Sequence, residues 1–166
     1  VAEATVGWML ALTHHFRMKD RLVREARWND RSQYMGCELR ERTLGVIGFG
    51  GIGRSLVKLL SGFGMNTPLV FDPFTTDEAV AAFGAKRVSL DELLMQSDFV
   101  SLHCPLNEQT RNLIGDRELR LMKPAAYFIN TARGGIVVEE ALIDALSNGR
   151  LAGAALDCFN DEPLTQ

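Results

Sequence analysis

Residues 44–53 have the sequence LGVIGFGGIG, in which a short apolar run leads directly into a turn that contains Gly48, Gly50 and Gly53. The apolar run predicts a buried strand, and residues 54–60 after it have the spacing of a helix. In a strand–turn–helix of this kind the first glycine allows the tight turn. The second lets the backbone approach a pyrophosphate, and the third permits close packing of helix on strand.

Asp72 ends the next apolar run, nineteen residues after Gly53. A carboxylate at this distance is suited to accept hydrogen bonds from both hydroxyls of a ribose, and it would repel a 2′-phosphate. The pattern therefore predicts NAD rather than NADP, with the phosphates at the amides of Gly51 and Ile52. Glycine patterns also occur in ordinary turns, and an Asp before Pro73 is by itself also typical of a turn.

From residue 43 onward, short β-rich runs alternate with helical patterns, which predicts a doubly wound α/β fold with a parallel sheet, the Rossmann fold. We expect strands at residues 44–47, 68–71, 87–88, 99–102, 127–129 and 154–156. Helices are expected at residues 51–63, 77–82, 89–95 and 139–147. Residues 1–27 have apolar residues at helical spacing and predict one amphipathic helix, whereas residues 28–42 predict an irregular connector.

The composition is that of an ordinary globular domain, with 166 residues, 46% hydrophobic and 23% charged. A net charge of -3 disfavours nucleic acid as a main partner. The apolar runs are far shorter than the ~18 residues that would cross a bilayer, so no membrane partner is expected. Three scattered cysteines without a Cys-x-x-Cys pair predict free thiols in the cytoplasm and no metal site.

The second half of the chain adds several linked motifs. In order they are DFVSLHCPL at 98–106, NEQTRNLI at 107–114, MKP at 122–124, FINTARGG at 128–135, EAL at 140–142 and GRLAGAALDCF at 149–159. Together with the glycine turn, these motifs resemble the D-isomer-specific 2-hydroxyacid dehydrogenase family, which includes phosphoglycerate, glycerate, hydroxypyruvate and D-lactate dehydrogenases. The resemblance covers nearly the whole chain.

The resemblance implies roles for individual residues. Arg133 matches the arginine that grips the carboxylate and carbonyl of a 2-hydroxy or 2-keto acid substrate, and Glu162 matches the acidic partner of the catalytic histidine. Asp157 and the backbone at Thr131 match positions that hold the nicotinamide carboxamide, and Thr110 lies near the pyrophosphate and nicotinamide ribose. The cofactor-binding set that we expect is Gly48, Gly50, Gly51, Ile52, Gly53, Asp72, Pro73, His103, Cys104, Pro105, Thr110, Thr131, Ala132, Arg133 and Asp157.

These roles agree with the chemistry of hydride transfer to a keto acid. A planar guanidinium can bind a carboxylate and a carbonyl with two directed hydrogen bonds. The alkoxide charge that forms requires a proton donor, for which an imidazolium oriented by a carboxylate is well suited. In the family this histidine lies beyond the Glu-Pro motif. His14 and His15 fall in the opening helix and His103 in the cofactor motif, so we expect no turnover from this chain alone.

The resemblance also implies the organisation of the chain. Residues 1–27 form the opening helix and a homodimer surface, residues 28–42 the connector, and residues 43–166 the NAD-binding domain. The substrate domain, built in the family from segments on both sides, is absent from the sequence. Cys104 and Cys158 stand where small aliphatic residues are common, and we interpret them as inert thiols.

Three alternatives stay open at this point. One is a dinucleotide-sensing interaction protein like the transcriptional corepressors that share this fold. Another is a formate dehydrogenase-like protein, against which Glu162 argues because a glutamine stands at that position there. A methyltransferase with a glycine loop would not require Arg133. The identity of the acid is also open, with phosphoglycerate, glycerate, glyoxylate and lactate all possible.

Overall fold

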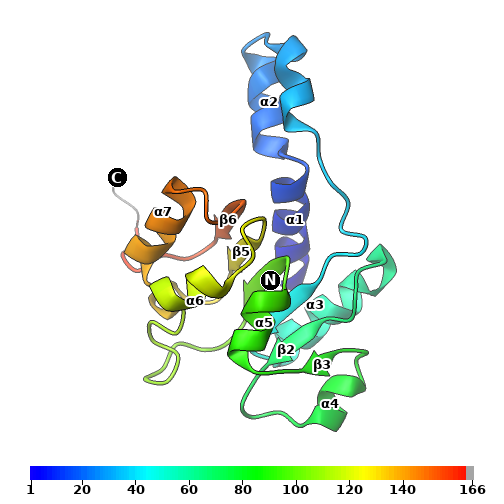
Figure 1. The fold of residues 1–166 in the computed structure, drawn as a ribbon, viewed down its shortest axis with the longest axis vertical. Coiled ribbons are helices and arrows are strands. Elements are labelled where there is room, and N and C mark those ends of the chain that lie inside the picture. Colours follow the sequence, from blue (N-terminus) through cyan, green and yellow to red (C-terminus); the bar gives the residue numbers. More distant parts are fainter. Residues whose placement is uncertain (164–166) are drawn as a thin grey trace.

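The computed structural model describes residues 1–163, and its centre is a six-stranded parallel sheet (Figure 1). The strand order is β3-β2-β1-β4-β5-β6. The strands are β1 (Leu44–Ile47), β2 (Leu69–Phe71), β3 (Lys86–Arg87), β4 (Phe99–Leu102), β5 (Tyr127–Asn130) and β6 (Gly153–Leu156). This order and the helices on both faces confirm the predicted doubly wound α/β fold.

The strand order reverses between β1 and β4, and this junction places the candidate site. Ile47, the last residue of β1, pairs with Phe71 on one side and with Leu102 on the other. The carboxyl ends of three neighbouring strands therefore meet at one edge of the sheet. Ligands of open α/β sheets bind outside this edge, at the point where the strand order reverses.

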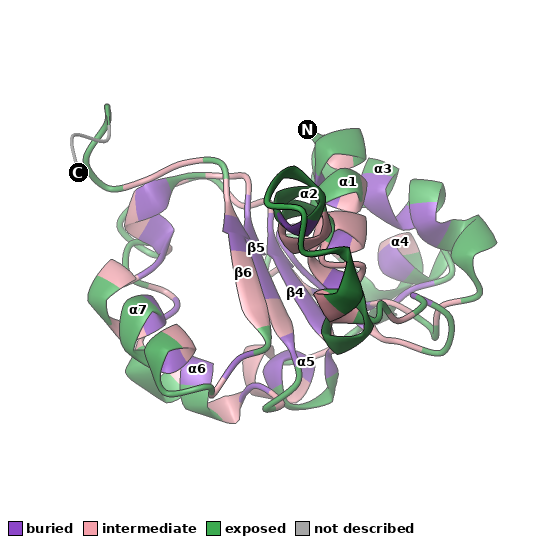
Figure 2. Ribbon diagram, turned by 90° about the horizontal axis from the view of Figure 1, so that it is seen from above, coloured by how far each residue is buried: buried purple, intermediate pink, exposed green. Residues whose placement is uncertain are grey.

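The helices form one layer on each face of the sheet (Figure 2). Helices α3 (Gly51–Leu60) and α4 (Asp77–Ala81) cover one face together with α1 (Ala2–Thr13), and their buried side chains include Met9, Leu56 and Val80. The other face carries α5 (Leu90–Gln96), α6 (Asp116–Leu121) and α7 (Glu139–Ser147), with Leu93, Leu119 and Leu142 buried. Each such side chain contributes roughly 1.5–3 kcal/mol through burial, so both layers are held mainly by the hydrophobic effect.

Several predicted boundaries differ from the structure by a few residues. The helix expected at 51–63 is α-helical only to Leu60, continues as the 3-10 helix Ser61–Phe63, and ends at Gly64 in the left-handed conformation. Strand β3 lies one residue earlier than expected and has both of its residues exposed. Helix α6 was not predicted from the sequence.

The prediction of one continuous helix over residues 1–27 is wrong. The chain forms α1, then breaks at His14 and His15, and continues as α2 (Phe16–Arg24). His15 adopts a left-handed conformation with φ 53°, which ends the helical hydrogen-bond pattern. Tertiary packing supports the break, because the ring of His14 lies against Gly36 and the ring of His15 contacts Tyr34.

Helix α2 extends away from the body of the domain (Figure 1). The 3-10 helix Trp28–Tyr34 packs beside it, inside the segment that we expected to be irregular. We call residues 16–34 the arm. Helix α1, in contrast, belongs to the body, because Met9 is fully buried and Leu12 lies against Gly153 of β6.

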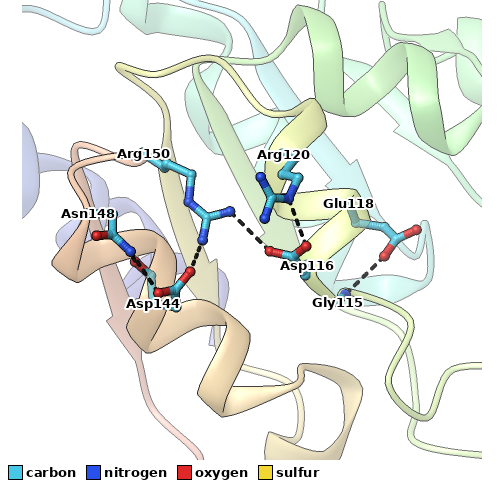
Figure 3. Close-up of polar contacts among 7 residues, drawn as sticks. All are labelled: Gly115, Asp116, Glu118, Arg120, Asp144, Asn148 and Arg150. Atoms are coloured by element: carbon cyan, nitrogen blue, oxygen red, sulfur yellow. Dashed lines mark hydrogen bonds and ion pairs between the residues drawn. The ribbon is translucent and has the colours of Figure 1, made fainter.

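Charged side chains join the layer of α6 and α7 at its outer surface (Figure 3). The guanidinium of Arg150 donates to Asp116 at 3.1 Å and also to Asp144, and thus bridges the two helices. Arg120 donates to the same Asp116 at 2.7 Å, and together the two arginines hold the pKa of this carboxyl below its usual range. Ion pairs this exposed contribute little stability, so the network aligns the helices more than it stabilises them.

No helix in the described part of the chain is long and apolar enough to cross a membrane. Cys37, Cys104 and Cys158 are all free thiols. Among residues 1–163 there is no group of three or more His, Cys, Asp or Glu side chains that could hold a metal ion.

Candidate functional site

The glycine turn that follows β1 lies close to the ends of β2 and β4, the two strands that flank β1. Gly48 has φ 94°, a conformation that side-chain-bearing residues rarely adopt, and its amide donates to Phe71 O at 2.9 Å. A Cβ at this position would lie 2.6 Å from the backbone nitrogen of Cys104. Only glycine therefore fits at the point where the chain turns out of the sheet.

The other two glycines of the motif have different surroundings. A Cβ on Gly53 would lie 2.4 Å from Gly48 O and 3.1 Å from a methyl of Val46, so α3 packs directly on the turn and on β1. Gly50 has nothing within 4 Å of the same position, and neither does Gly51. The first turn of α3, with its unsatisfied amides and the positive end of the helix dipole, therefore faces open space.

Asp72 follows β2 and reaches across to the glycine turn. Its Oδ2 accepts a hydrogen bond from Phe49 N at 2.7 Å, and its Oδ1 accepts one from Phe74 N at 2.8 Å. Each oxygen of an ionised carboxylate has a second lone pair, so both can still accept a bond from a ligand. The carboxylate thus shapes the turn and also remains available to a ribose.

A hollow of about 400 Å³, which we call the Asp72 hollow, opens beside this carboxylate. Apolar walls from Ile47, Phe71 and Leu113 face a few polar groups, as is typical of small-molecule sites. Eight of the residues predicted from the sequence line it, namely Gly48, Gly50, Asp72, Pro73, His103, Cys104, Pro105 and Thr110.

Thr110 is part of a tight turn at the rim of the Asp72 hollow. Its hydroxyl donates to Pro105 O at 2.6 Å and accepts from Asn107 N at 2.9 Å. The expected position of Thr110 was near the pyrophosphate and the nicotinamide ribose. The structure places Thr110 in the lining of the Asp72 hollow, with its hydroxyl already bound to the backbone.

His103 lies between the Asp72 hollow and a second one. Its Nε2 is 2.9 Å from Ser101 Oγ, while Nδ1 is buried and has no hydrogen-bond partner among the described residues. Burial lowers the pKa of this imidazole to about 4, so the ring is neutral near pH 7. An orphaned polar atom beside an open glycine turn fits a site that takes a polar ligand such as a dinucleotide.

The second hollow, of about 610 Å³, contains Arg133, and we call it the Arg133 hollow. Ile52 lines it on one side and Thr131 and Ala132 on the other. It shares three lining residues with the Asp72 hollow, namely His103, Cys104 and Pro105. A third hollow of about 1060 Å³ adjoins both at His103 and is lined by Gly50, Gly51 and Ile52. Thirteen of the fifteen predicted cofactor residues line these three adjoining hollows and form a row from Asp72 to Arg133, whereas Gly53 and Asp157 line none of them.

Arg133 follows β5 in an exposed turn, and its Nη1 donates to Ala132 O at 2.7 Å. Two residues that the sequence analysis did not single out shape this turn. Buried Asn130 binds the backbone of Ala132 and Arg133, and buried Thr5 of α1 places its Oγ1 3.4 Å from Thr131 Oγ1. Asn130 stood inside a quoted motif, but nothing in the sequence pattern pointed to Thr5.

Glu162 and Asp157 lie near Arg133 without contacting it. Glu162 Oε1 accepts from Phe159 N at 2.9 Å, and no ion pair joins it to Arg133 in the described part of the chain. Neither acid is among the residues that line the Arg133 hollow. Burial first, and then the charges of Glu162 and Asp157, raise the pKa of the Cys158 thiol, while Arg133 opposes the effect. The two carboxylates, together with Glu139, thus act on the pKa of this thiol in the opposite direction to Arg133.

The two site cysteines are poor nucleophiles. Burial is the main cause that raises the pKa of Cys104 as well as that of Cys158. A thiol with a raised pKa remains protonated at neutral pH, and only the thiolate attacks or binds metal. Both residues thus contribute shape to the site.

The comparisons agree with this geometry. Residues 6–166 match the family described as D-isomer specific 2-hydroxyacid dehydrogenase, NAD binding domain. The D-3-phosphoglycerate dehydrogenase of Methanocaldococcus jannaschii is 42% identical over 164 residues, which are 98% of this chain and 31% of that protein. The glyoxylate reductase of Thermococcus litoralis is 40% identical over 168 residues, 98% of this chain and 50% of that protein.

One solved structure is similar to the chain in both fold and sequence. The D-lactate dehydrogenase from Aquifex aeolicus, complexed with NAD and lactic acid, superposes with a TM-score of 0.90 and 37% identity. The match covers 97% of this chain and 48% of that one. The chain therefore spans half or less of the length of each of these relatives.

Proposed function

Because the chain belongs to the D-isomer specific 2-hydroxyacid dehydrogenases, as their NAD-binding domain, we propose that the complete protein interconverts a D-2-hydroxy acid and a 2-keto acid. The observation that carries this proposal is the row of residues from Asp72 to Arg133 along one edge of the sheet. A dinucleotide is long enough to require such a row, and a keto acid requires a cation at its end. The matched family and these relatives are dehydrogenases, so the alternative of a corepressor-like interaction protein has no support.

In this proposal the adenosine end of the cofactor is bound near Asp72 and its nicotinamide end near Arg133. The Asp72 hollow would hold the adenosine, with Asp72 accepting from the ribose hydroxyls, and the amides of Gly51 and Ile52 in the first turn of α3 would bind the phosphates. Thr131 and Ala132 would hold the nicotinamide end, and Asp157 its carboxamide. Bound NAD supplies the acceptor or donor of the hydride.

Arg133 binds the carboxylate and carbonyl of the acid, and its exposed guanidinium is free of acidic partners in residues 1–163. Glu162 acts as the partner of a general-acid histidine through Oε2, because only its Oε1 is bound to Phe159 N. None of the three histidines of the chain fits that task, because His14 and His15 lie at the base of the arm and His103 is neutral. We therefore propose that the histidine and the substrate domain lie outside the sequence and that the chain alone is inactive.

We further propose that the arm forms the contact of a homodimer. Its apolar side chains are unusually open to solvent, with Phe16, Val23 and Trp28 each more than half exposed. A second copy of the chain would cover them. For the compartment we propose the cytoplasm, because the three thiols are unpaired.

The experiment that tests the function uses the complete protein. NADH oxidation is followed with a panel of 2-keto acids and, in the reverse direction, NAD reduction with D- and L-2-hydroxy acids and with formate. We expect turnover of a D-2-hydroxy acid and its keto acid, and an Arg133→Ala variant with kcat/KM reduced at least ~100-fold and NADH affinity reduced much less.

The matched control is Arg117→Ala, which removes an exposed arginine that is paired with Asp91 on the outer face of the sheet. It should leave kcat/KM unchanged. Turnover of formate alone, or an Arg133→Ala enzyme as active as wild type, would contradict the proposal.

A further inference from the structure

We propose that Asn130 is a positioning residue for the dehydrogenase reaction, which holds the turn that carries Arg133 and the loop that carries Glu162 in fixed relation. The inference rests on the proposed function, because it assigns Asn130 a role through those two side chains. Asn130 is the last residue of β5 and is only 1% exposed. It lies directly under the turn rather than in either hollow.

The side-chain amide of Asn130 closes the Arg133 turn from below. Its Nδ2 donates to Arg133 O at 2.9 Å, and its Oδ1 accepts from Ala132 N at 3.0 Å. The two bonds fix the backbone on both sides of the peptide that leads into Arg133. The direction in which the guanidinium leaves the turn is set by that backbone.

The main-chain carbonyl of Asn130 binds the second segment, the loop that leads to Glu162. This carbonyl accepts from Asp157 N at 2.9 Å and from the thiol of Cys158 at 3.6 Å, at the start of the loop. The turn and this loop also touch directly, because a Cβ on Gly134 would lie 2.1 Å from the carbonyl carbon of Phe159. One residue therefore joins both segments, with no space for either to slide.

The position requires the chemistry of asparagine. The site needs a donor and an acceptor on two separate atoms of a short, uncharged side chain, whereas a hydroxyl carries both on one oxygen and an amide carries them apart. Aspartate would retain the acceptor for Ala132 N but place a carboxylate oxygen against Arg133 O. Alanine would remove the acceptor of Ala132 N and leave Arg133 O with only the long 3.4 Å bond from Ile136 N, so the turn would lose the contacts that fix it.

The bond from Asp157 N to Asn130 O is made by the main chain and remains in any variant of Asn130, so we expect a substitution of its side chain to affect substrate through Arg133 alone. In the complete protein, Asn130→Asp should raise KM for the keto acid at least ~10-fold and lower kcat/KM by ~10- to 100-fold, while the NADH dissociation constant stays within ~2-fold. The control is Asn148→Ala, which removes an exposed amide bound to Asp144 at the end of α7 and should change none of these values.

A double-mutant cycle separates positioning from general damage. If Asn130 acts through Arg133, then Asn130→Asp should reduce kcat/KM by less than ~2-fold in an Arg133→Ala background. A full further loss in that background, or a parallel loss of NADH affinity, would overturn the inference.

A second measurement on the same protein does not depend on activity. Amide hydrogen exchange at Ala132 should become at least ~10-fold faster in Asn130→Ala, with the amides of α3 unchanged. Unchanged exchange at Ala132 would overturn the inference even in an active enzyme. If the wild type has no activity but exchange at Ala132 is still faster in Asn130→Ala, the proposed function is wrong. The conclusion that the Asn130 side chain holds the Arg133 turn is then still supported.

Discussion

The carboxylate of Asp72 and the backbone amide of Phe49 are joined by a 2.7 Å hydrogen bond, which ties the end of β2 to the glycine turn after β1. The residue expected to select the ribose is therefore also part of the scaffold of the phosphate-binding turn. Loss of this side chain would change cofactor affinity for two reasons, and substitutions of different shape can separate them.

Asp72→Ala should lower the free energy of unfolding by about 1–2 kcal/mol, because the amides of Phe49 and Phe74 lose their acceptor. NADH affinity should fall at least ~10-fold. Asp72→Asn keeps one acceptor oxygen and should lose less stability. Both variants remove the negative charge, so the preference for NADH over NADPH should shrink in each. Urea denaturation and calorimetric titration measure the two effects.

The control for Asp72 is Asp77→Ala, which removes a nearby exposed carboxylate paired with Arg87. It should leave the NADH to NADPH ratio unchanged. A wild-type protein that binds both cofactors equally, or an Asp72→Ala variant with an unchanged ratio, would show that this carboxylate does not select the cofactor.

Two alanine substitutions in the glycine turn should differ in their effects, one on stability and the other on NADH binding. Gly53→Ala forces a methyl to within 2.4 Å of Gly48 O and should cost about 1–3 kcal/mol of stability, as overpacking does. Gly50→Ala meets nothing within 4 Å and should leave stability nearly unchanged while it weakens NADH binding. Thermal unfolding and titration of both variants, with Gly62→Ala as an unhindered control, check this pattern. If Gly50→Ala bound NADH as tightly as the wild type, the proposed position of the phosphates at this turn would be wrong.

The buried imidazole of His103 predicts a pH dependence of stability. Its pKa falls from 6.5 in the unfolded chain to about 4 in the fold, so between these values the unfolded state binds more protons. The contribution is complete above pH 6.5 and is lost as the pH falls toward 4, by up to about 3 kcal/mol. His103→Gln should remove this part of the slope. Urea midpoints of wild type and variant, compared from pH 4 to 7.5, test it, and parallel curves would refute it.

The arm offers a test of the dimer. Trp28 is 58% exposed and carries the guanidinium of Arg31 4.6 Å from its ring centroid, an arrangement common at contacts between proteins. Trp28→Glu should convert the dimer to a monomer in light scattering after size exclusion, without a change in NADH affinity. Ile143→Glu, at a similarly exposed site on α7, should not. A monomeric wild type, or a Trp28→Glu variant that dimerises as strongly as the wild type, would show that the arm is not the dimer contact.

The sequence was most informative where local pattern and burial agree. Strands β1 and β4 are continuous apolar runs whose residues are all buried, and their predicted bounds match the structure. The break at His14 and His15 could not be predicted, because neither residue favours a break. The break is supported by packing against Gly36 and Tyr34, far along the chain.

The same distinction holds for the candidate site. Gly48 and Asp72 have signatures that depend only on spacing along the sequence, and the structure brings them to one edge. Thr5 meets Thr131 across 126 positions, so no local pattern could connect them. Glu162 was assigned by resemblance, and its present bond to Phe159 N follows from the path of the loop rather than from the residue type.

Strand β3 has a consequence for how the protein behaves at high concentration. An exposed sheet edge is a template on which another chain can add a strand. Here that edge is only Lys86 and Arg87, both exposed and each paired with an acid, Glu92 or Asp77. So short and charged a border gives an incoming strand little backbone to pair with, which protects this edge of the sheet against edge-to-edge aggregation.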